Sequence, residues 1–441
     1  MPTELHVGID DTDSPWGMCT TYLGALLVAE FVRRGYEFID FPYLVRLNPN
    51  VPFKTRGNGA VSIHLTTSAE VDGVAELVEE YLERYAYRHG KTDPTAVLLA
   101  GPIDTLKEVY LRALSELIPP KIVVKVLEKM KARIIGNAKG RGVIGAAASI
   151  GAFSMSYYSY ELTLYRPPTS GQRCKSIEQD VVELDKLLRP LTYSNVDYSS
   201  GRVLATPRGP DPVIAGVRSF TPLILSSIAP RLAEKWSAQL ALIYKTNQST
   251  GEHLAQRKSI ARVRPYDSAT VRGRVSGEAK TLPGGHIVFA LSDDTGRITC
   301  VVYRETGFLT KVARLLRDGD IVEVCGGFVP RSKGLTLNVE CIRVLQTAPL
   351  VSEGNPRCPV CGKHLKSAGR NKGFKCASCG YRARSATKIV RITPRVLEPG
   401  LYLQSPIAYR HLSRTRDSLG APPVPAPPLP QLFLWPYPPT A

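Results

Sequence analysis

Three aspartates stand within four positions near the start of the chain, in the run Asp10-Asp11-Thr12-Asp13. Carboxylates this close repel one another, which raises their pKa values unless a cation lies among them. A hard divalent cation such as Mg2+ prefers oxygen donors and commonly carries nucleotide phosphates. The spacing leaves two interpretations open, a magnesium site or an Asp-rich turn that is merely solvated.

A second candidate is the glycine-rich run over residues 136–145, which contains Lys139, Gly140, Arg141 and Gly142. Glycines let the backbone approach a ligand closely, and the two cations favour an anion at the start of a following helix. The run lacks the spacing of an ordinary Walker loop, and glycine-rich turns without ligands are common. Together with the acidic run it supplies both halves that phosphate chemistry needs, ligands for a metal and cations for the phosphates.

Four cysteines form the most specific local pattern in the chain: Cys358, Cys361, Cys376 and Cys379. Two Cys-x2-Cys pairs at this separation place four thiolates around Zn2+ in a zinc ribbon. Four protein ligands leave the ion no open position, so we expect a structural zinc. Lysines and arginines surround the pairs, which favours contact with phosphates, although such a charge run can also simply solvate a small domain.

The other five cysteines are scattered along the chain: Cys19, Cys174, Cys300, Cys325 and Cys341. Scattered thiols suit a reducing compartment better than a disulfide framework. The chain shows no signal peptide and no run of about 20 apolar residues of the kind that spans a membrane. We therefore expect a cytoplasmic protein with reduced thiols and no membrane partner.

The charge balance favours a polyanionic partner. The chain of 441 residues has 57 lysines and arginines against 39 aspartates and glutamates, which gives a formal net charge of +18. A field of this sign favours nucleic acid, although a basic protein without such a partner remains an alternative. The hydrophobic content of 43% is that of a protein with real cores. The length is enough for about three or four domains.

The acidic and glycine-rich runs both fall within a first α/β unit, residues 1–155. Strands are expected at 5–9, 37–47, 60–66 and 96–99, and helices at 20–34, 69–87 and 104–116. This alternation is typical of a layered sheet covered by helices. The acidic run then lies at the carboxyl end of a buried strand, where open α/β sheets bind ligands. A polar loop at 47–59 carries Lys54, Arg56 and Asn58, which are candidates for contact with substrate or RNA.

Residues 156–255 show the βαββαβ order of a ferredoxin-like fold. Strands are expected at 160–165, 195–199, 212–218 and 239–244, and helices at 179–188 and 230–236. This unit ends in Asn247, Gln248 and Thr250. These polar residues follow a strand, so they either contact a ligand or RNA or belong to a linker.

Residues 268–347 carry five strand patterns with a helix between the third and the fourth. This is the layout of an OB-fold, which most often binds single-stranded nucleic acid or structured RNA, although a protein-binding role remains open. The zinc ribbon spans 355–385, and 386–441 form a C-terminal extension. After Gly420 this extension is rich in proline and is expected to be extended or disordered rather than packed. Among its apolar residues, Leu432, Phe433 and Trp435 suggest at most a docking segment for a partner.

The order of these motifs resembles the archaeal agmatidine synthetase family, the 2-agmatinylcytidine synthetases of the AUA-decoding isoleucine tRNA. The resemblance rests on the acidic run with Gly17-Met18-Cys19-Thr20-Thr21, the 47–59 loop, the Lys139-Gly140-Arg141-Gly142 run, and a ferredoxin-like unit ending in Thr246-Asn247-Gln248, followed by an OB-fold and a zinc ribbon. It covers residues 1–385 and fails for the proline-rich tail. It implies a multidomain α/β chain with a kinase-like N-terminal catalytic module that binds ATP and Mg2+.

The resemblance implies an ATP-dependent ligase that joins agmatine to C2 of the wobble cytidine in the minor isoleucine tRNA. The C2 oxygen is activated by phosphorylation and then displaced by the agmatine amine, so that the anticodon reads AUA instead of AUG. No obligate protein partner is implied. Carried over to this sequence, the magnesium ligands are Asp10, Asp11 and Asp13, the autophosphorylated residue is Thr20, and the ATP phosphates meet Lys139, Gly140, Arg141 and Gly142.

The residues alone favour a plainer role for Thr20, the N-cap of the helix expected at 20–34. Two rival functions also fit part of the pattern. A non-enzymatic single-strand-binding protein combines an OB-fold with a zinc ribbon, but it leaves the acidic and glycine-rich runs without a role. A different RNA-modifying or RNA-ligating ATPase shares every feature except the amine. The identities of the amine and of the modified base rest on the resemblance.

Overall fold

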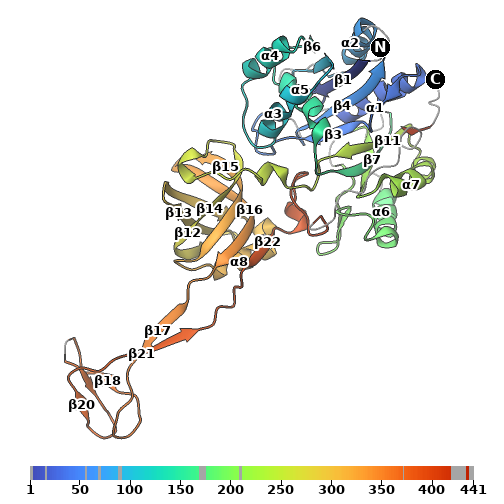
Figure 1. Ribbon diagram of the computed structural model, residues 1–441. Coiled ribbons are helices and arrows are strands. Elements are labelled where there is room, and N and C mark those ends of the chain that lie inside the picture. The colour runs from blue at the N-terminus through green and yellow to red at the C-terminus, as the bar shows by residue number, and fades with distance from the viewer. Residues whose placement is uncertain are drawn as a thin grey trace.

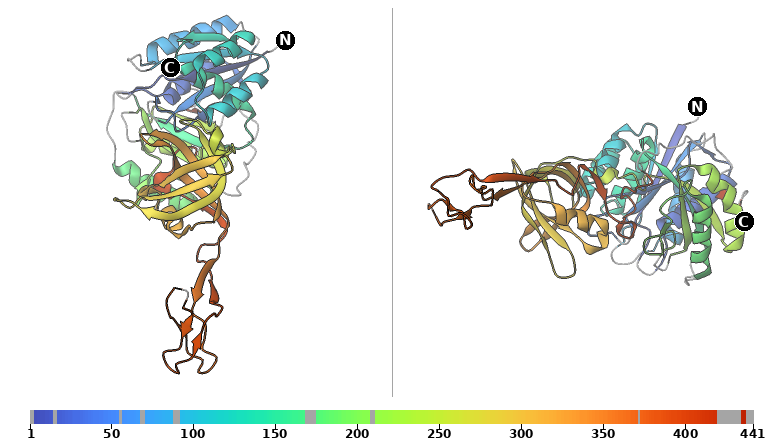
Figure 2. Two further views of the ribbon diagram at one scale, coloured as in Figure 1. Left: turned by 90° about the vertical axis from the view of Figure 1, so that its left-hand side faces the viewer. Right: turned by 90° about the horizontal axis from the view of Figure 1, so that it is seen from below.

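The computed structural model describes residues 3–14, 17–54, 57–67, 71–87, 92–167, 175–207, 211–370, 372–418 and 434–436. Arg56, Cys174, Leu432 and Phe433 lie outside these residues, and so do the predictions made for them. An α/β body, a β-barrel beside it and a thin arm that ends in small strands follow one another in space (Figure 1). Figure 2 shows the arm extending away from the barrel in two further views.

The body is built on one sheet of ten strands. Eight of them follow the order β10-β7-β11-β3-β4-β1-β5-β6, and β2 pairs with β4 while β23 pairs with β11. Their bounds are β1 Thr3–Asp10, β2 Glu37–Phe38, β3 Tyr43–Arg46, β4 Gly59–Thr67, β5 Thr95–Ala100, β6 Arg133–Gly136, β7 Ser159–Tyr165, β10 Val213–Ser219, β11 Leu240–Thr246 and β23 Leu434–Trp435. The units expected on either side of residue 155 therefore share one sheet, which is joined where β11 runs parallel to β3.

Helices cover both faces of this sheet. One face carries α1 Thr20–Arg33, α2 Val71–Tyr85, α6 Lys175–Leu188 and α7 Pro222–Lys235, and the other carries α3 Asp104–Ala113, α4 Pro120–Lys129 and α5 Gly142–Gly151. Strand β1 shows the alternation that makes two cores. Its Leu5, Val7 and Ile9 belong to the first core, whereas Gly8 faces α5. A Cβ at Gly8 would lie 2.0 Å from the Ala146 carbonyl oxygen, so the helix packs directly on the strand backbone.

Two strands differ from the sequence-based expectation. The strand expected over 37–47 is divided into β2 and β3 by Asp40, whose carboxylate accepts a hydrogen bond from the Tyr43 hydroxyl at 2.7 Å. The strand expected over 195–199 is reduced to β8 Val196–Asp197, which pairs with β9 Arg202–Val203 outside the main sheet. There the Asp197 carboxylate accepts hydrogen bonds from the following serines, which turn the chain before a longer strand forms.

The barrel confirms the predicted OB-fold. Its strands are β12 Ser268–Thr281, β13 Ile287–Asp293, β14 Gly296–Val302, β15 Ile321–Arg331 and β16 Gly334–Gln346, with α8 Phe308–Leu315 between the third and the fourth. Parallel pairing of β14 with β16 closes the barrel. Strand β22 Gly400–Leu403 adds a sixth strand along β16, and the short 3-10 helices η2 Glu252–Leu254 and η3 Ile260–Arg262 lead into the barrel from the body.

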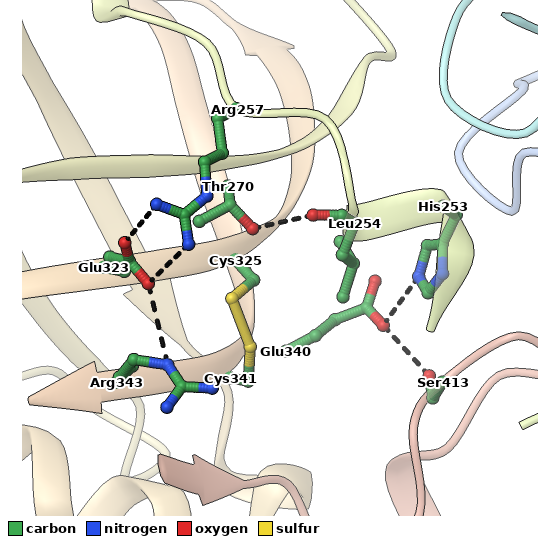
Figure 3. Close-up of a disulfide and its surroundings, with 10 residues drawn as sticks. All are labelled: His253, Leu254, Arg257, Thr270, Glu323, Cys325, Glu340, Cys341, Arg343 and Ser413. Carbon is green, nitrogen blue, oxygen red and sulfur yellow. Dashed lines mark hydrogen bonds and ion pairs between the residues drawn. A yellow bond between two sulfur atoms is a disulfide. The ribbon is translucent and has the colours of Figure 1, made fainter. Parts of the chain in front are cut away.

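A disulfide contradicts the prediction that the scattered cysteines stay reduced. Cys325 on β15 and Cys341 on β16 are cross-strand partners, and their sulfur atoms are bonded (Figure 3). Their Cα atoms are 5.1 Å apart, a separation that a disulfide bridges. The strand register brings the two cysteines together, and nothing in their spacing along the sequence signals it.

The arm begins with β17 Leu350–Gly354 paired to β21 Ile389–Thr393, and it ends in β18 Lys366–Ser367, β19 Phe374–Lys375 and β20 Arg382–Ala383. Residues 400–418, which we call the C-terminal strap, return from the arm and contact both the barrel and the body. The expectation that nothing packs after Gly420 is wrong at β23, because Leu434 is buried and pairs with β11 ahead of the point where β3 begins to pair with that strand. Within the described residues no helix is long and apolar enough to cross a bilayer.

Candidate active site

A cavity of about 810 Å³ lies where the two halves of the body meet the loop that follows β3. Its walls bring together seven of the predicted residues, namely Asp10, Asp11, Asp13, Thr20, Lys54, Asn58 and Arg141. Strands β7 and β10 contribute Glu161, Thr163, Gly216 and Arg218, and the C-terminal strap contributes His411. Six other predicted residues do not line it: Lys139, Gly140, Gly142, Asn247, Gln248 and Thr250.

Asp10 ends β1 and is enclosed by α5. A Cβ at Gly145 would lie 1.8 Å from the Asp10 Oδ2 atom, so only glycine at this helix position leaves room for the carboxylate. Burial, together with the neighbouring charge of Asp11, raises the pKa of Asp10 well above its ordinary value. A carboxylate held in this way is one that a bound cation would stabilise in its charged form.

Asp11 is fixed by a residue that the sequence did not single out. Its φ of 58° lies in the left-handed region, which is unusual for a residue with a side chain and often occurs at functional sites. The Asp11 Oδ2 atom accepts a hydrogen bond from the Asp93 backbone N–H at 2.8 Å. Burial raises the pKa of Asp11 to about 6, although this N–H opposes the rise. No local pattern could have identified Asp93, because only the folded chain brings it to the acidic run.

The three carboxylates fit a magnesium ion that is shared with phosphates better than a closed protein cage. Within the described residues, the groups of His, Cys, Asp or Glu whose ligand atoms lie within 4.8 Å of one another do not include Asp10, Asp11 and Asp13. Mg2+ is usually held by one or two carboxylates together with substrate phosphates and water. The donor set and its spread suit that kind of site.

The glycine-rich run forms a tight loop that leads into α5. The Asp93 carboxylate accepts hydrogen bonds from the Asn137 side chain at 2.9 Å and from the Arg141 backbone N–H at 3.2 Å. The backbone N–H of Lys139 donates to the Asn137 side chain at 3.1 Å, so these amides serve the loop itself. What the loop offers to the cavity is the Arg141 guanidinium, 5.0 Å from the centre of the Phe53 ring, and the positive end of the α5 dipole.

Thr20 is the first residue of α1, and the alternative role as N-cap is wrong. Cys19 occupies the cap position with extended backbone angles and makes no side-chain capping bond. The Thr20 side chain is buried at the cavity wall, where its Oγ1 atom accepts a hydrogen bond from the Thr12 hydroxyl at 3.2 Å. Its hydroxyl thus lies beside the acidic run rather than over the first turn of the helix.

The loop after β3 docks the barrel onto the body. The Asn58 side chain donates to the Asn48 carbonyl at 2.8 Å, which closes the neck of the loop. The Asn48 Oδ1 atom accepts from the Ser268 hydroxyl on β12 at 2.8 Å, and the Asn50 side chain donates to the same hydroxyl at 2.8 Å. A Cβ at Gly327 on β15 would lie 2.1 Å from the Asn50 amide nitrogen, so the two surfaces touch closely.

The polar run after β11, residues 247–250, hydrogen-bonds to residues of the cavity wall from inside the protein. Asn247 is fully buried, and its side chain pairs with both the N–H and the carbonyl of Arg46 at 2.8 and 2.9 Å. Gln248 donates to the Glu161 carboxylate at 2.6 Å and contacts the His411 ring at 2.9 Å. The Thr250 hydroxyl donates to the Asn247 carbonyl within a turn. Of the two roles left open for these residues, their hydrogen bonds favour the internal one, and contact with a ligand or RNA stays a prediction.

The four cysteines of the arm form a candidate metal centre. Their sulfur atoms all lie within 4.8 Å of one another. The Ser378 backbone N–H donates to the Cys376 sulfur at 3.4 Å, a contact that stabilises the thiolate that zinc binds. Gly362 and Gly380 follow the two Cys pairs with φ of 71° and 78°, a turn that residues with side chains rarely adopt. Four thiolates in this arrangement fit a structural zinc ion.

Comparison with known families assigns the body up to residue 253, the barrel and the ribbon. Residues 6–139 match the model of the TiaS TCKD domain, 140–253 the TiaS FLD domain, 269–345 an OB-fold nucleic acid binding domain, and 355–397 the TiaS C-terminal zinc ribbon domain. The chain is 48% identical to the isoleucine-tRNA 2-agmatinylcytidine synthetase TiaS of Thermofilum pendens over 432 residues, which cover 96% of this chain and 97% of that protein. The corresponding protein of Pyrococcus horikoshii is 38% identical over 414 residues, with 93% and 96% covered.

Solved structures agree with this result. A complex of TiaS with the minor isoleucine tRNA and ATP superposes with a TM-score of 0.78 at 33% identity and covers 96% of this chain and 99% of that one. A complex of TiaS with the same tRNA, AMPCPP and agmatine gives a TM-score of 0.77 at 31% identity, with the same coverage.

Proposed function

The chain belongs to the family of isoleucine-tRNA 2-agmatinylcytidine synthetases, and from this premise we propose how its residues divide the reaction. The protein is an ATP-dependent ligase that joins agmatine to the wobble cytidine of the minor isoleucine tRNA and forms agmatidine. The observation that carries the proposal is one large cavity. It brings the acidic run, Thr20 and Arg141 from one half of the body to face β7 and β10 from the other half.

We assign the nucleotide to the side of the cavity formed by the acidic run and α5. The ATP phosphates meet Arg141 and the start of α5, and Asp10, Asp11 and Asp13 hold Mg2+, which offsets phosphate charge when it is bound. Asp93 is a positioning residue in this assignment, because it orders both Asp11 and the loop before α5. Lys139 is exposed on that loop, and Gly140 and Gly142 pack against Asp93 at distances that leave no room for a Cβ.

The chemistry requires this arrangement. A carbonyl oxygen at C2 is a poor leaving group, so displacement by an amine needs prior conversion to a phosphate ester. The target base must leave its stack to reach a buried site, which an anticodon loop allows at little cost. The buried Thr20 hydroxyl lies within the same cavity and is the residue that we propose to be autophosphorylated. The carboxylates of Glu161 and Asp211 on the opposite wall are of the kind that a dicationic amine needs.

We propose that the chain is divided into five parts, residues 1–155, 156–255, 268–347, 355–385 and 386–441. We also propose a cytoplasmic location, because ATP and tRNA are found there. The strap contributes His411 to the cavity wall, and the loop after β3 joins the barrel to the body beside it. We propose that the barrel, arm and strap position the tRNA through phosphate contacts while the body performs the chemistry.

One assay tests the function. Purified protein is incubated with ATP, Mg2+, labelled agmatine and an unmodified transcript of the minor isoleucine tRNA, and the RNA is digested and examined by mass spectrometry. We expect label in one modified cytidine of the anticodon and turnover of ATP that depends on both the RNA and the amine. RNA binding without ATP turnover would instead support a non-enzymatic single-strand-binding protein.

A further inference from the structure

A second cavity of about 580 Å³ adjoins the active-site cavity. The two share Arg46, Leu47, Lys54, Gly57, Leu204, Arg218 and His411. The further wall of the second cavity comes from β9 and the turn before β8, and from residues 406–415 of the C-terminal strap. It therefore lies between the body and the strap.

The wall of this second cavity is strongly basic. It carries Arg46, Lys54, Arg202, Arg218 and Arg410, and no aspartate or glutamate is among the described residues that line it. The carboxylates of Glu161 and Glu340 lie nearby, the first 3.1 Å from the Arg218 Nε atom and the second 3.9 Å from the Arg410 Nη1 atom. Asp197 and Asp417 also act on Tyr409 in the wall. Four carboxylates outside the lining against five cations in it leave an excess of positive charge, which favours an anionic ligand.

Arg46 gives an independent indication of a missing partner. Its Nε atom is buried and has no hydrogen-bond partner within the described residues. The guanidinium extends over two glycines, because a Cβ at Gly57 or Gly59 would lie 2.9 or 2.8 Å from its Nη1 atom. A buried charged donor without a partner is costly, so an anion that accepts from this group would stabilise the site.

His411 is held as a neutral ring whose one N–H is donated to the Gln248 side-chain oxygen, so it shapes the wall and the anion must be bound by the cations around it. Its ring contacts Gln248 at 2.9 Å, and the charge of Arg46, followed by burial, lowers the pKa of His411 well below its ordinary value. The strap that carries it is fixed to the body by hydrogen bonds from the Ser249 and Gly251 N–H groups to the carbonyls of His411 and Leu412, each 2.8 Å long. The wall is therefore a built structure rather than a loose surface.

We propose that this second cavity is a phosphodiester site, which holds an RNA backbone phosphate adjoining the cytidine presented to the larger cavity. The inference rests on the proposed function and names a contact that positions its substrate. Agmatine is excluded by its own positive charges. ATP is already assigned to the side of the larger cavity that holds the acidic run. A nucleotide that is swung out of its stack brings its own phosphates to the edge of the pocket, where these cations stand.

The test begins with Arg202→Gln, because this side chain makes no ion pair within the described residues and the change should not disturb the fold. Affinity for the unmodified tRNA is measured over a range of salt concentrations. We expect a roughly tenfold loss of affinity and a salt slope that is smaller by about 1, the value of one lost phosphate contact. The KM for ATP should not change. Arg231→Gln on the exposed side of α7 is the matched control and should leave both quantities nearly unchanged.

A second arm replaces the phosphate instead of the cation. An anticodon stem-loop with an uncharged methylphosphonate on either side of the target cytidine should bind wild type more weakly, while the Arg202→Gln variant should show little further loss. Equal losses in both proteins would overturn the proposal, and so would a raised KM for ATP with unchanged RNA affinity. The same binding measurements with Lys54→Gln test the contact from the loop after β3. These comparisons measure RNA affinity only. They therefore test the phosphodiester site independently of the turnover assay, which tests the proposed function.

Discussion

Asp10 keeps its position because residue 145 has no side chain. The carboxylate is buried against the α5 backbone at a point where a methyl group would lie 1.8 Å from Oδ2. The site therefore depends on a glycine that touches no substrate. Such a requirement is invisible in the sequence, where Gly145 looks like part of a glycine-rich loop rather than the partner of an aspartate.

Gly145→Ala should reduce turnover of ATP on the order of 100-fold while the protein stays folded. The added methyl group forces the Asp10 carboxylate out of its place, and misplacing a metal ligand by about 1 Å costs on the order of 100-fold in rate. The measurement is tRNA-dependent release of AMP, alongside thermal unfolding. Gly73→Ala on α2 is the matched control, because a Cβ at Gly73 meets nothing within 4 Å and should leave both activity and stability intact. Full activity of Gly145→Ala would contradict the placement of Asp10.

Single residues also show which parts of the site could be predicted from the sequence. The acidic run, Thr20 and Arg141 were found because their types suit phosphate chemistry, and they do share one cavity. Asp93 and His411 were missed, since each is an ordinary polar residue until the fold brings it to the site. Asn247 shows the opposite case, because its amide has the chemistry of a ligand contact and the sequence could not show that it holds the backbone of Arg46.

At the level of elements, strands β15 and β16 of the barrel are joined by a disulfide. The Cys325–Cys341 bond joins neighbouring strands beside Leu254, at the point where the chain enters the barrel from the body (Figure 3). Disulfides inside cells are rare except in proteins from very hot environments. The scattered cysteines had indicated a reduced protein, and only the register of the two strands shows otherwise.

Replacing both cysteines, Cys325→Ala with Cys341→Ala, should destabilise the barrel by roughly 3 kcal/mol, the chain-entropy value for a loop of about this length. Differential scanning calorimetry of wild type with and without reductant measures the effect. Reductant should lower the melting temperature of wild type and leave that of the double variant unchanged. Equal responses of the two proteins would show that the bond does not contribute.

The C-terminal strap and the barrel meet at a buried ion pair. Burial alone would raise the pKa of Glu340, but His253 at 3.2 Å, Arg410 and the Ser413 hydroxyl lower it to about 2. A carboxyl with a lowered pKa stabilises the fold fully above its unfolded value, near 4.5, and loses that contribution as the pH falls toward 2.

Glu340→Gln should therefore be less stable than wild type at pH 7, by on the order of 2–3 kcal/mol, and the difference should shrink as the pH falls from 4.5 toward 2. Urea unfolding at several pH values measures this. Glu353→Gln on β17 is the control, since Glu353 is 56% exposed in its pair with Lys388 and should have little effect at any pH. A difference that stays constant with pH would argue against a charged Glu340.

Strand and helix patterns predicted the elements well where one periodicity dominates, as in α1, α2 and the five strands of the barrel. They failed where local side-chain bonds override the pattern, at Asp40 and Asp197. They also could not show that β11 pairs with β3, because a parallel contact between distant strands leaves no mark in either segment. The sequence therefore predicted a separate sheet for each of the two N-terminal units, although in the structure their strands form one sheet.

In the whole molecule, the arm is connected to the barrel through the strand pair β17 and β21. The pair β17 and β21 separates the ribbon from the barrel (Figure 2), and the ribbon's own apolar cluster is confined to Cys358, Leu365, Phe374 and Cys376. A cluster this small cannot hold the ribbon folded without its metal. The ribbon surface carries Lys363, Lys366, Arg370, Lys372, Lys375, Arg382 and Arg384.

Removal of zinc should therefore unfold the ribbon and leave the catalytic body intact. We expect a zinc-selective chelator used in the presence of excess Mg2+, or Cys361→Ser, to weaken binding of tRNA and to reduce its salt dependence, because the basic surface of the ribbon is no longer held in place. Binding of ATP should be unchanged, since the nucleotide side of the cavity is built from the acidic run and α5. Hydrogen exchange should show loss of protection confined to the arm. Loss of ATP binding on chelation would mean that the metal supports the body as well, and that arm and body do not fold independently.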